Sequence, residues 1–190
     1  MALLLASTAA AIFLALYIKV CYHLFLPRRE NFAICTALSV LAISIGTALV
    51  QRRGLDFTTA LVLAGLTLVP IFSAFGGIAA AFHALEAGRD ALPWIILSGF
   101  VLVIPYVFLG ATIPALLRHE SSVARTSGRA LLLSGIGNAV GLLCFTLVHP
   151  WFALPTIPIA IWALLLVACL VHGGLSRRHV AALAISAAIL

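Results

Sequence analysis

The polar side chains of one apolar segment gather on a single helix face. Positions i, i+3, i+4 and i+7 hold Ser134, Gly137, Asn138 and Gly141, and this spacing places side chains on one side of a helix. Gly137 and Gly141 form the GxxxG pattern of closely packed membrane helices, and Asn138 could hydrogen-bond across to a neighbouring helix. The same hydroxyl and amide groups could instead line an internal cavity. The residues alone leave both interpretations open.

A second set of candidate residues lies in the preceding apolar segment, where Gly110, Thr112 and Pro114 stand close together. A proline inside a helix removes a backbone donor and bends the helix. Interrupted helices surround the sites of transporters, although prolines are also frequent in membrane helices generally. We expect these three residues to line any cavity together with Ser134 and Asn138.

One charged side chain, Lys19, stands well inside an apolar segment. A charge within the membrane points by default to a functional role. Lys19 lies about two helical turns from Pro27, so its long side chain could instead reach the membrane surface. The full set of predicted cavity residues is Lys19, Gly110, Thr112, Pro114, Ser134 and Asn138.

No residue pattern predicts a catalytic residue or a cofactor. The motifs of zinc proteases, serine hydrolases and nucleotide-binding P-loops are absent. The acidic residues all fall between apolar segments, so no carboxylate pair within a span could move protons. His23, His83 and His149 would lie near one membrane boundary and could bind a metal ion, but no two histidines stand three or four residues apart. We predict interfacial histidines and no metal site.

The composition of the chain fits lipid rather than water. Its 190 residues are 64% hydrophobic and only 8% charged, whereas soluble domains carry roughly 25% charged residues. Apolar runs of about 20 residues suit transmembrane helices, and lipid-exposed backbone excludes open strands. The absence of a basic stripe argues against nucleic acid as a partner. We predict an all-α, polytopic integral membrane helix bundle whose partner is the lipid bilayer.

Six apolar segments are predicted to form transmembrane helices within a single domain, 1–190. A further run, 180–190, would reach only about 16 Å as a helix, too short for a hydrocarbon core of roughly 30 Å, and we interpret it as a truncated seventh span. The six segments cover 2–26, 32–50, 58–85, 92–117, 130–149 and 151–171, and a polar connector is predicted at 118–129.

The distribution of basic residues predicts the orientation, because cytoplasmic connectors carry an excess of Lys and Arg. We therefore predict a multi-pass protein of the inner or plasma membrane with a cytoplasmic N-terminus. The side of the N-terminus would hold Arg52, Arg53, Arg118, Arg125, Arg129, Arg177 and Arg178, and the other side Arg28, Arg29 and Arg89.

Residues 107–118, which read Val-Phe-Leu-Gly-Ala-Thr-Ile-Pro-Ala-Leu-Leu-Arg, resemble a segment of bacterial membrane-integrated spermidine synthase-like proteins. Asn138-Ala-Val-Gly141 matches the Asn-x-x-Gly spacing that follows in that family. There, a transporter-like membrane half precedes a soluble aminopropyltransferase domain. The resemblance implies a membrane domain that transports a small cationic metabolite such as a polyamine, or that anchors to the membrane the protein that handles this metabolite. It also implies a soluble aminopropyltransferase-like domain as partner.

The chain departs from the family pattern in two places. Its first segment has Tyr17-Ile-Lys19-Val-Cys-Tyr22 where the family has Tyr-Glu-x-x-Trp, and the glycine-rich nucleotide loop of the enzyme half is absent. Aminopropyl transfer is therefore not assigned to these residues. Two other functions stay open. One is a structural or assembly subunit that packs on a partner membrane subunit through Gly137 and Gly141, and the other is an intramembrane enzyme with a metal ion at the outer histidines.

Overall fold

The computed structural model describes residues 1–25, 29–73, 77, 80, 91–118, 123–151, 156–173, 176, 179–180 and 182. These residues form helices and short connectors, and none of them lies in a β-strand, so the predicted all-α class is confirmed for this part of the chain. The elements are α1 (Ala2–Phe25), α2 (Arg29–Arg53), α3 (Phe57–Ser73), α5 (Ala91–Gly110), α6 (Thr112–Leu117), α7 (Val123–Val148), the 3-10 turn η1 (His149–Trp151) and α8 (Thr156–His172).

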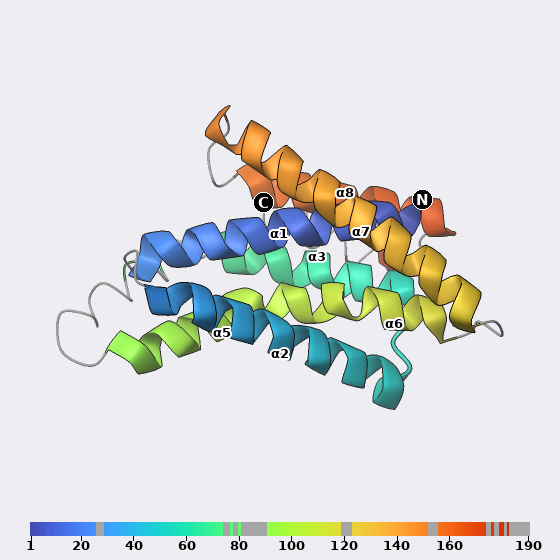
Figure 1. Cartoon of the computed structure of the whole chain (residues 1–190), viewed down its shortest axis with the longest axis horizontal. Coiled ribbons are helices and arrows are strands. Elements are labelled where there is room, and N and C mark those ends of the chain that lie inside the picture. The colour runs from blue at the N-terminus through green and yellow to red at the C-terminus, as the bar shows by residue number, and fades with distance from the viewer. Residues whose placement is uncertain are drawn as a thin grey trace.

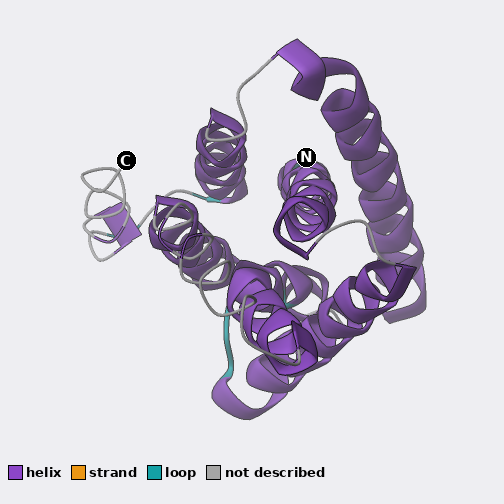
Figure 2. Cartoon of the chain, turned by 90° about the vertical axis from the view of Figure 1, so that its left-hand side faces the viewer, coloured by secondary structure: helices purple, strands orange, loops and turns teal. Residues whose placement is uncertain are grey.

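The long helices lie side by side, with α1 at the centre of the bundle (Figure 1). α1 packs against α7, α8, α5, α2 and α6, and the end-on view shows it surrounded by the other helices (Figure 2). α3 lies between α5 and α8, and α2 packs along α5. We call the end that holds the start of α1 and the end of α2 the Met1 end, and the opposite end, where α1 finishes, the Phe25 end (Figure 1).

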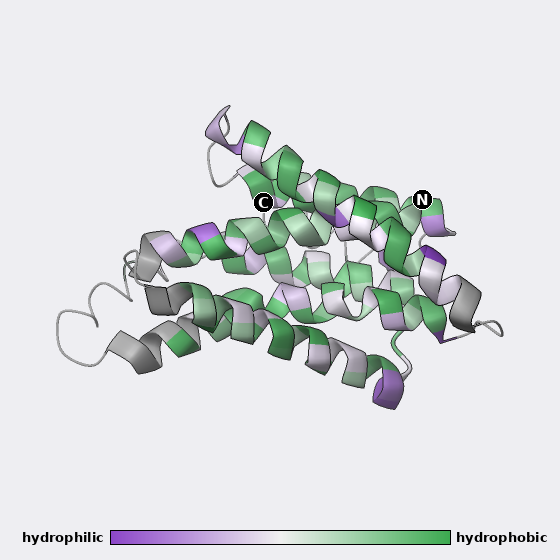
Figure 3. Ribbon diagram, viewed as in Figure 1, coloured by the Kyte–Doolittle hydropathy of each residue, from purple (hydrophilic) through white to green (hydrophobic). Residues whose placement is uncertain are grey.

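The outer surface of the bundle is apolar, as expected for helices solvated by lipid. Val40 on α2 and Leu143 and Leu147 on α7 are 58%, 62% and 68% exposed, and Figure 3 shows hydrophobic residues along much of the length of the helices. The chain thus contains several helices that can cross a membrane. By length and composition they are Ala2–Tyr22, Phe32–Arg53, Gly99–Leu117 and Thr126–Trp151, and the shorter apolar helices are Phe57–Ser73 and Thr156–His172.

Aromatic rings fix α1 against α3 and α5. The Phe13 ring stacks on Tyr106 with centroids 5.9 Å apart and meets the edge of Phe72 at 6.1 Å. The Tyr17 hydroxyl donates a 3.1 Å hydrogen bond to the carbonyl of Gly99, so this buried phenol has a partner in an environment without water. Phe13 and Tyr17 are both fully buried, which makes this cluster the centre of the core.

Several helix boundaries differ from those that the sequence predicts: α2 covers Arg29–Arg53 instead of 32–50, and α8 begins at Thr156 instead of 151. α7 begins at Val123, so the second half of the polar connector predicted at 118–129 is helical. A helix satisfies its own backbone and can continue beyond the apolar layer, so polarity does not end it. The segment predicted as one helix over 92–117 is interrupted at Ala111. The predicted third span is described as a continuous helix only as far as Ser73, and most of 180–190 lies outside the described residues.

The start of α3 is capped by Asp56, which lies in the connector after α2. Its two carboxylate oxygens accept hydrogen bonds from the Thr59 hydroxyl at 2.6 Å and the Thr59 backbone amide at 3.0 Å, the arrangement of an N-cap residue. Burial acts to raise the pKa of Asp56, but these hydrogen bonds and the nearby His179 ring outweigh it, and the pKa lies below its usual value.

We expect Asp56→Ala to destabilise the detergent-solubilised protein by about 1 kcal/mol at pH 7, because α3 loses its cap. A carboxyl whose pKa is lowered by folding stabilises the protein above its unfolded pKa of about 4, and this stability is lost as pH falls through the folded pKa. Asp56→Asn keeps only one acceptor oxygen and cannot titrate, so it should retain part of the neutral-pH stability and lose this pH dependence. Thermal unfolding over a range of pH values measures the stability at pH 7 and its pH dependence. Equal melting temperatures of Asp56→Ala and wild type at pH 7 would contradict the capping role of Asp56.

Candidate functional site

α7 is held against α1 by its two helix-packing glycines. A Cβ atom at Gly137 would lie 2.6 Å from the carbonyl oxygen of Leu4, and one at Gly141 would lie 2.5 Å from the carbonyl oxygen of Thr8. The backbones therefore approach closely, as in small-residue membrane interfaces. α1 fills this face of α7 within the same chain. A partner subunit would have to pack on a different face, which removes the basis for the predicted assembly contact through these glycines.

A cavity of about 130 Å³ lies beside this contact, between α1, α2, α5, α6 and α7. α2 and α7 bound it on opposite sides and make at most marginal contact with each other. Its lining is of mixed polarity, in contrast to the largely apolar core around it. The residues that line it are Ser7, Ala10, Ile43, Tyr106, Leu109, Gly110, Thr112, Ile113, Ser134 and Asn138.

The interruption between α5 and α6 shapes one wall of the cavity. Pro114 has no amide proton, so it cannot donate to the carbonyl of Gly110 four residues earlier. The chain tightens here, with the Ala111 amide bonded to the carbonyl of Phe108 at 3.2 Å. Thr112 is buried, and its hydroxyl donates to the carbonyl of Leu109 at 2.7 Å. The interruption thus places a hydroxyl and locally irregular backbone at the cavity wall.

Gly110 is required at this wall for a separate reason. A Cβ atom on Gly110 would lie 2.7 Å from the Cα of Ile43 on α2. A Cβ atom on Gly46, one turn further along α2, would likewise clash with the backbone carbonyl oxygen of Val107. These two glycines allow α2 and α5 to pack backbone against backbone, and this close approach brings Ile43 to the cavity.

The polar groups of the cavity come from α1 and α7. Ser7 and Ser134 are 5% and 8% exposed, and the Ser7 hydroxyl donates to the Ser134 hydroxyl at 3.2 Å. Asn138 lies one turn further along α7 and is exposed at the open side of the cavity. Its amide makes no hydrogen bond within the described part of the chain. A polar amide near the middle of a spanning helix is costly without a partner, so Asn138 is the group best placed to bind a ligand or water.

The structure brings together four of the six predicted cavity residues, namely Gly110, Thr112, Ser134 and Asn138. Lys19 and Pro114 do not line the cavity: Lys19 lies on α1 towards the Phe25 end, and Pro114 acts on the wall only by interrupting the helix. Sequence reasoning missed Ser7 and Tyr106. Ser7 and the adjacent Thr8 are the first polar residues in the opening apolar run, and this local signal could have drawn attention to them.

The cavity carries no charged side chain among its lining residues, and each polar group is a hydroxyl or an amide. Such groups donate and accept hydrogen bonds but form no ion pair. Within the described residues, no three His, Cys, Asp or Glu side chains lie close enough to hold a metal ion. The side chain of His23, and all of His83, fall outside the described residues, so a metal ion at the outer histidines stays a hypothesis.

In comparisons with known proteins, no family model, no curated protein and no solved structure matches this chain. The resemblance of residues 107–118 to spermidine synthase-like membrane proteins therefore stays a prediction. The function has to be argued from the cavity itself.

Proposed function

We propose that this chain is a transporter-like membrane domain that binds a small amphipathic molecule in the cavity between α1, α2, α5, α6 and α7. The observation that carries the proposal is the coincidence of an interrupted helix with the buried pair Ser7 and Ser134 and the unpartnered amide of Asn138. Transporters place discontinuous helices and polar side chains around substrate sites near the middle of the bilayer.

The lining favours one chemical class of ligand. Hydroxyl and amide groups on one side would bind a hydrogen-bonding head, while Ala10, Ile43 and Leu109 would contact an apolar stem. A polyamine, which the family resemblance implies, would have to donate its ammonium protons to neutral oxygens, because no carboxylate is among the lining residues. A neutral or singly charged amphipathic molecule suits these groups better than a multiply charged one.

The topology of the proposal is six transmembrane helices and a partial seventh in the inner membrane, with the N-terminus in the cytoplasm. Cationic side chains support this orientation, because Arg52, Arg53, Arg118 and Arg129 are all exposed at or near the Met1 end. Cytoplasmic connectors are enriched in such residues. A soluble aminopropyltransferase-like partner would then meet the bundle at this end.

A cysteine introduced at Asn138 tests the cavity. Cys144 is the one native cysteine that is exposed, so the background is Cys144→Ala. We expect Asn138→Cys to react with a membrane-impermeant methanethiosulfonate reagent about tenfold faster than Ile136→Cys, since only a hydrated thiol can ionise and react. Ile136 lies at nearly the same depth on α7 but is exposed to lipid, at 45% exposure.

A second cysteine, Ile113→Cys in the same background, reports on the ligand class, because Ile113 lines the cavity and its replacement leaves the Asn138 amide in place. Putrescine and its uncharged analogue 1,4-butanediol are the probes, and slower labelling of Ile113→Cys in the presence of either one places that probe in the cavity. Protection by butanediol but not putrescine would favour a neutral substrate. Equal labelling of Asn138→Cys and Ile136→Cys would mean that the cavity is dry, and the proposal would fail.

A further inference from the structure

Two cysteines from different helices come together near the Phe25 end of the bundle. α1 ends at Phe25 and α2 begins at Arg29, and the two helices run antiparallel to each other (Figure 1). Cys21 stands four residues before the end of α1, and Cys35 stands six residues after the start of α2. These positions lie about 6 Å and 9 Å along the helix axes from the connector, so the two side chains have nearly the same depth in the bundle.

The packing around Gly99 on α5 sets the register of α1 and α2. A Cβ atom on Gly99 would lie 2.8 Å from the Cδ1 atom of Leu38 and 3.3 Å from the hydroxyl oxygen of Tyr17, so Leu38 and Tyr17 reach the same point between the helices. Cys21 follows Tyr17 by one turn and Cys35 precedes Leu38 by one turn, and in each pair the two residues share a helix face. In antiparallel helices these two steps lead to the same level.

The side chains of Cys21 and Cys35 meet at that level. The two thiols interact directly with each other, and the Tyr17 hydroxyl interacts with both. Cys21 is 0% exposed and Cys35 is 3% exposed. Two thiols that face each other across a helix contact are the arrangement from which a disulfide forms without a large movement of the backbone.

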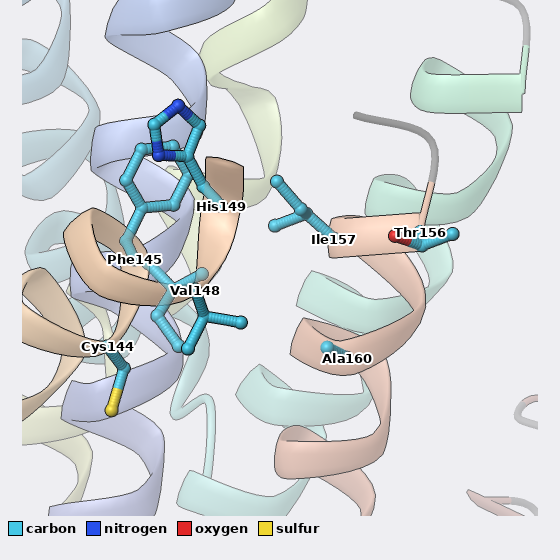
Figure 4. Close-up of a pocket in the computed structure, with 8 residues that line it drawn as sticks. Cys144, Phe145, Val148, His149, Thr156, Ile157 and Ala160 are labelled. Carbon is cyan, nitrogen blue, oxygen red and sulfur yellow. The ribbon is translucent and has the colours of Figure 1, made fainter. Parts of the chain in front are cut away.

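The other two cysteines lack such a neighbour and serve as internal references. Cys144 is exposed on α7 and lines the apolar crevice between α7 and α8, beside Phe145 and Val148 (Figure 4). Cys169 is buried on α8. Neither of them contacts another cysteine in the described part of the chain. The four cysteines therefore comprise one facing pair and two separate thiols.

The proposed orientation exposes the pair to an oxidising compartment. With the N-terminus in the cytoplasm, the Phe25 end lies on the other side of the membrane, where disulfides form and persist. Synthesis delivers α1 and α2 before α5, and the amino-terminal part of a chain folds first. Both thiols can thus meet an oxidant before Gly99 and its helix cover them, and their later burial protects the product from reductants.

We propose that Cys21 and Cys35 form a disulfide that joins α1 to α2 at the Phe25 end. The oxidant is a disulfide compound of that compartment. One cysteine thiolate attacks it to form a mixed disulfide, and the second thiolate attacks the mixed disulfide to form the intramolecular bond. The oxidant gains two electrons and leaves as two thiols, which carry the two protons lost by the cysteines. This assignment depends on the orientation in the proposed function, whereas the ligand of the polar cavity has no bearing on it.

A count of free thiols tests the disulfide in cells. Cells that express the full chain are quenched with acid, the protein is denatured and treated with N-ethylmaleimide, and its intact mass is measured. We expect wild type to take up two maleimide groups, at Cys144 and Cys169, and four after reduction with dithiothreitol. Cys21→Ser should take up one more than wild type, because Cys35 loses its partner, and the matched control Cys169→Ser should take up one fewer. Four maleimide groups on unreduced wild type overturn the proposal.

Synthesis in vitro separates the pairing from the orientation. The chain is translated in a cell-free system into nanodiscs, so that oxidised glutathione reaches both faces of the bilayer. We expect the link to form with oxidised glutathione and not with dithiothreitol. The linked protein should melt at least about 5 °C above Cys21→Ser, because closing a loop of about 15 residues constrains the unfolded chain.

Two results of these experiments would overturn the disulfide for different reasons. If no link forms in nanodiscs, α1 and α2 do not pair through these cysteines. If the link forms in nanodiscs but not in cells, the Phe25 end faces the reducing cytoplasm and the proposed orientation is wrong. Neither result alters the labelling expected at the polar cavity, so the proposed ligand site is tested separately.

Discussion

Replacement of Gly141 by leucine is expected to prevent the bundle from forming. The first side-chain carbon would lie 2.5 Å from the carbonyl oxygen of Thr8 and 2.8 Å from the Cβ of Ala11. The first of these atoms belongs to the backbone of α1 and cannot turn aside, so α1 and α7 would have to separate. Overpacking a tight contact costs about 3 kcal/mol or more when backbone must move, a large share of a typical folding stability of roughly 5–15 kcal/mol.

Gly135→Leu is the matched control, because Gly135 lies on the same helix and a Cβ atom at this position would meet no other atom within 4 Å. Its leucine would face lipid at no steric cost. Size-exclusion chromatography and thermal unfolding in detergent distinguish the variants. We expect aggregation, or a sharply lower melting temperature, for Gly141→Leu and near wild-type behaviour for Gly135→Leu. Similar behaviour of the two variants would mean that α1 and α7 do not pack through this face.

The two interpretations of the residue 134–141 pattern prove to describe adjacent sides of one helix. At 3.6 residues per turn, Asn138 lies about 100° around the helix from Gly137, while Gly141 lies only about 40° from it. The glycines therefore meet α1, and Asn138 points towards the edge of that contact. A sequence pattern gives the relative direction of these residues, but only the position of α1 decides which of them are covered.

The apolar segments were predictable because a bilayer allows few alternatives to a long helix. The contacts between cavity residues that come from different helices were not predictable. Ser7 meets Ser134 across a separation of 127 residues, and neither residue carries a local signal of that contact. The start of α7 was also missed, because hydropathy marks where a helix enters lipid rather than where its hydrogen bonds begin. Thr112 and Gly110 were predicted as cavity residues because a proline interrupts a helix within the four residues that precede it, and Pro114 marks that place in the sequence.

Asn138→Leu is expected to abolish transport while it leaves the fold intact. The branched side chain would occupy part of the cavity of about 130 Å³ and remove the one amide among its lining residues, which has no partner within the described part of the chain. We expect uptake of the probe that protects Ile113→Cys, putrescine or 1,4-butanediol, to fall at least about tenfold in proteoliposomes, the effect of losing one hydrogen bond to a ligand together with its space. The melting temperature should not fall, because Asn138 makes no hydrogen bond to any described residue and an apolar group replaces a polar one beside lipid.

Thr146→Leu separates this effect from a general change in α7. Thr146 is exposed on the same helix, and its hydroxyl bonds only to the carbonyl of Leu142 in its own helix, at 2.8 Å, away from the cavity. That variant should transport as wild type does. If uptake survives Asn138→Leu, Asn138 serves packing alone and the cavity is not the transport site. If uptake and melting temperature fall together, the amide stabilises the bundle, and the loss of uptake is a consequence of unfolding rather than of an altered site.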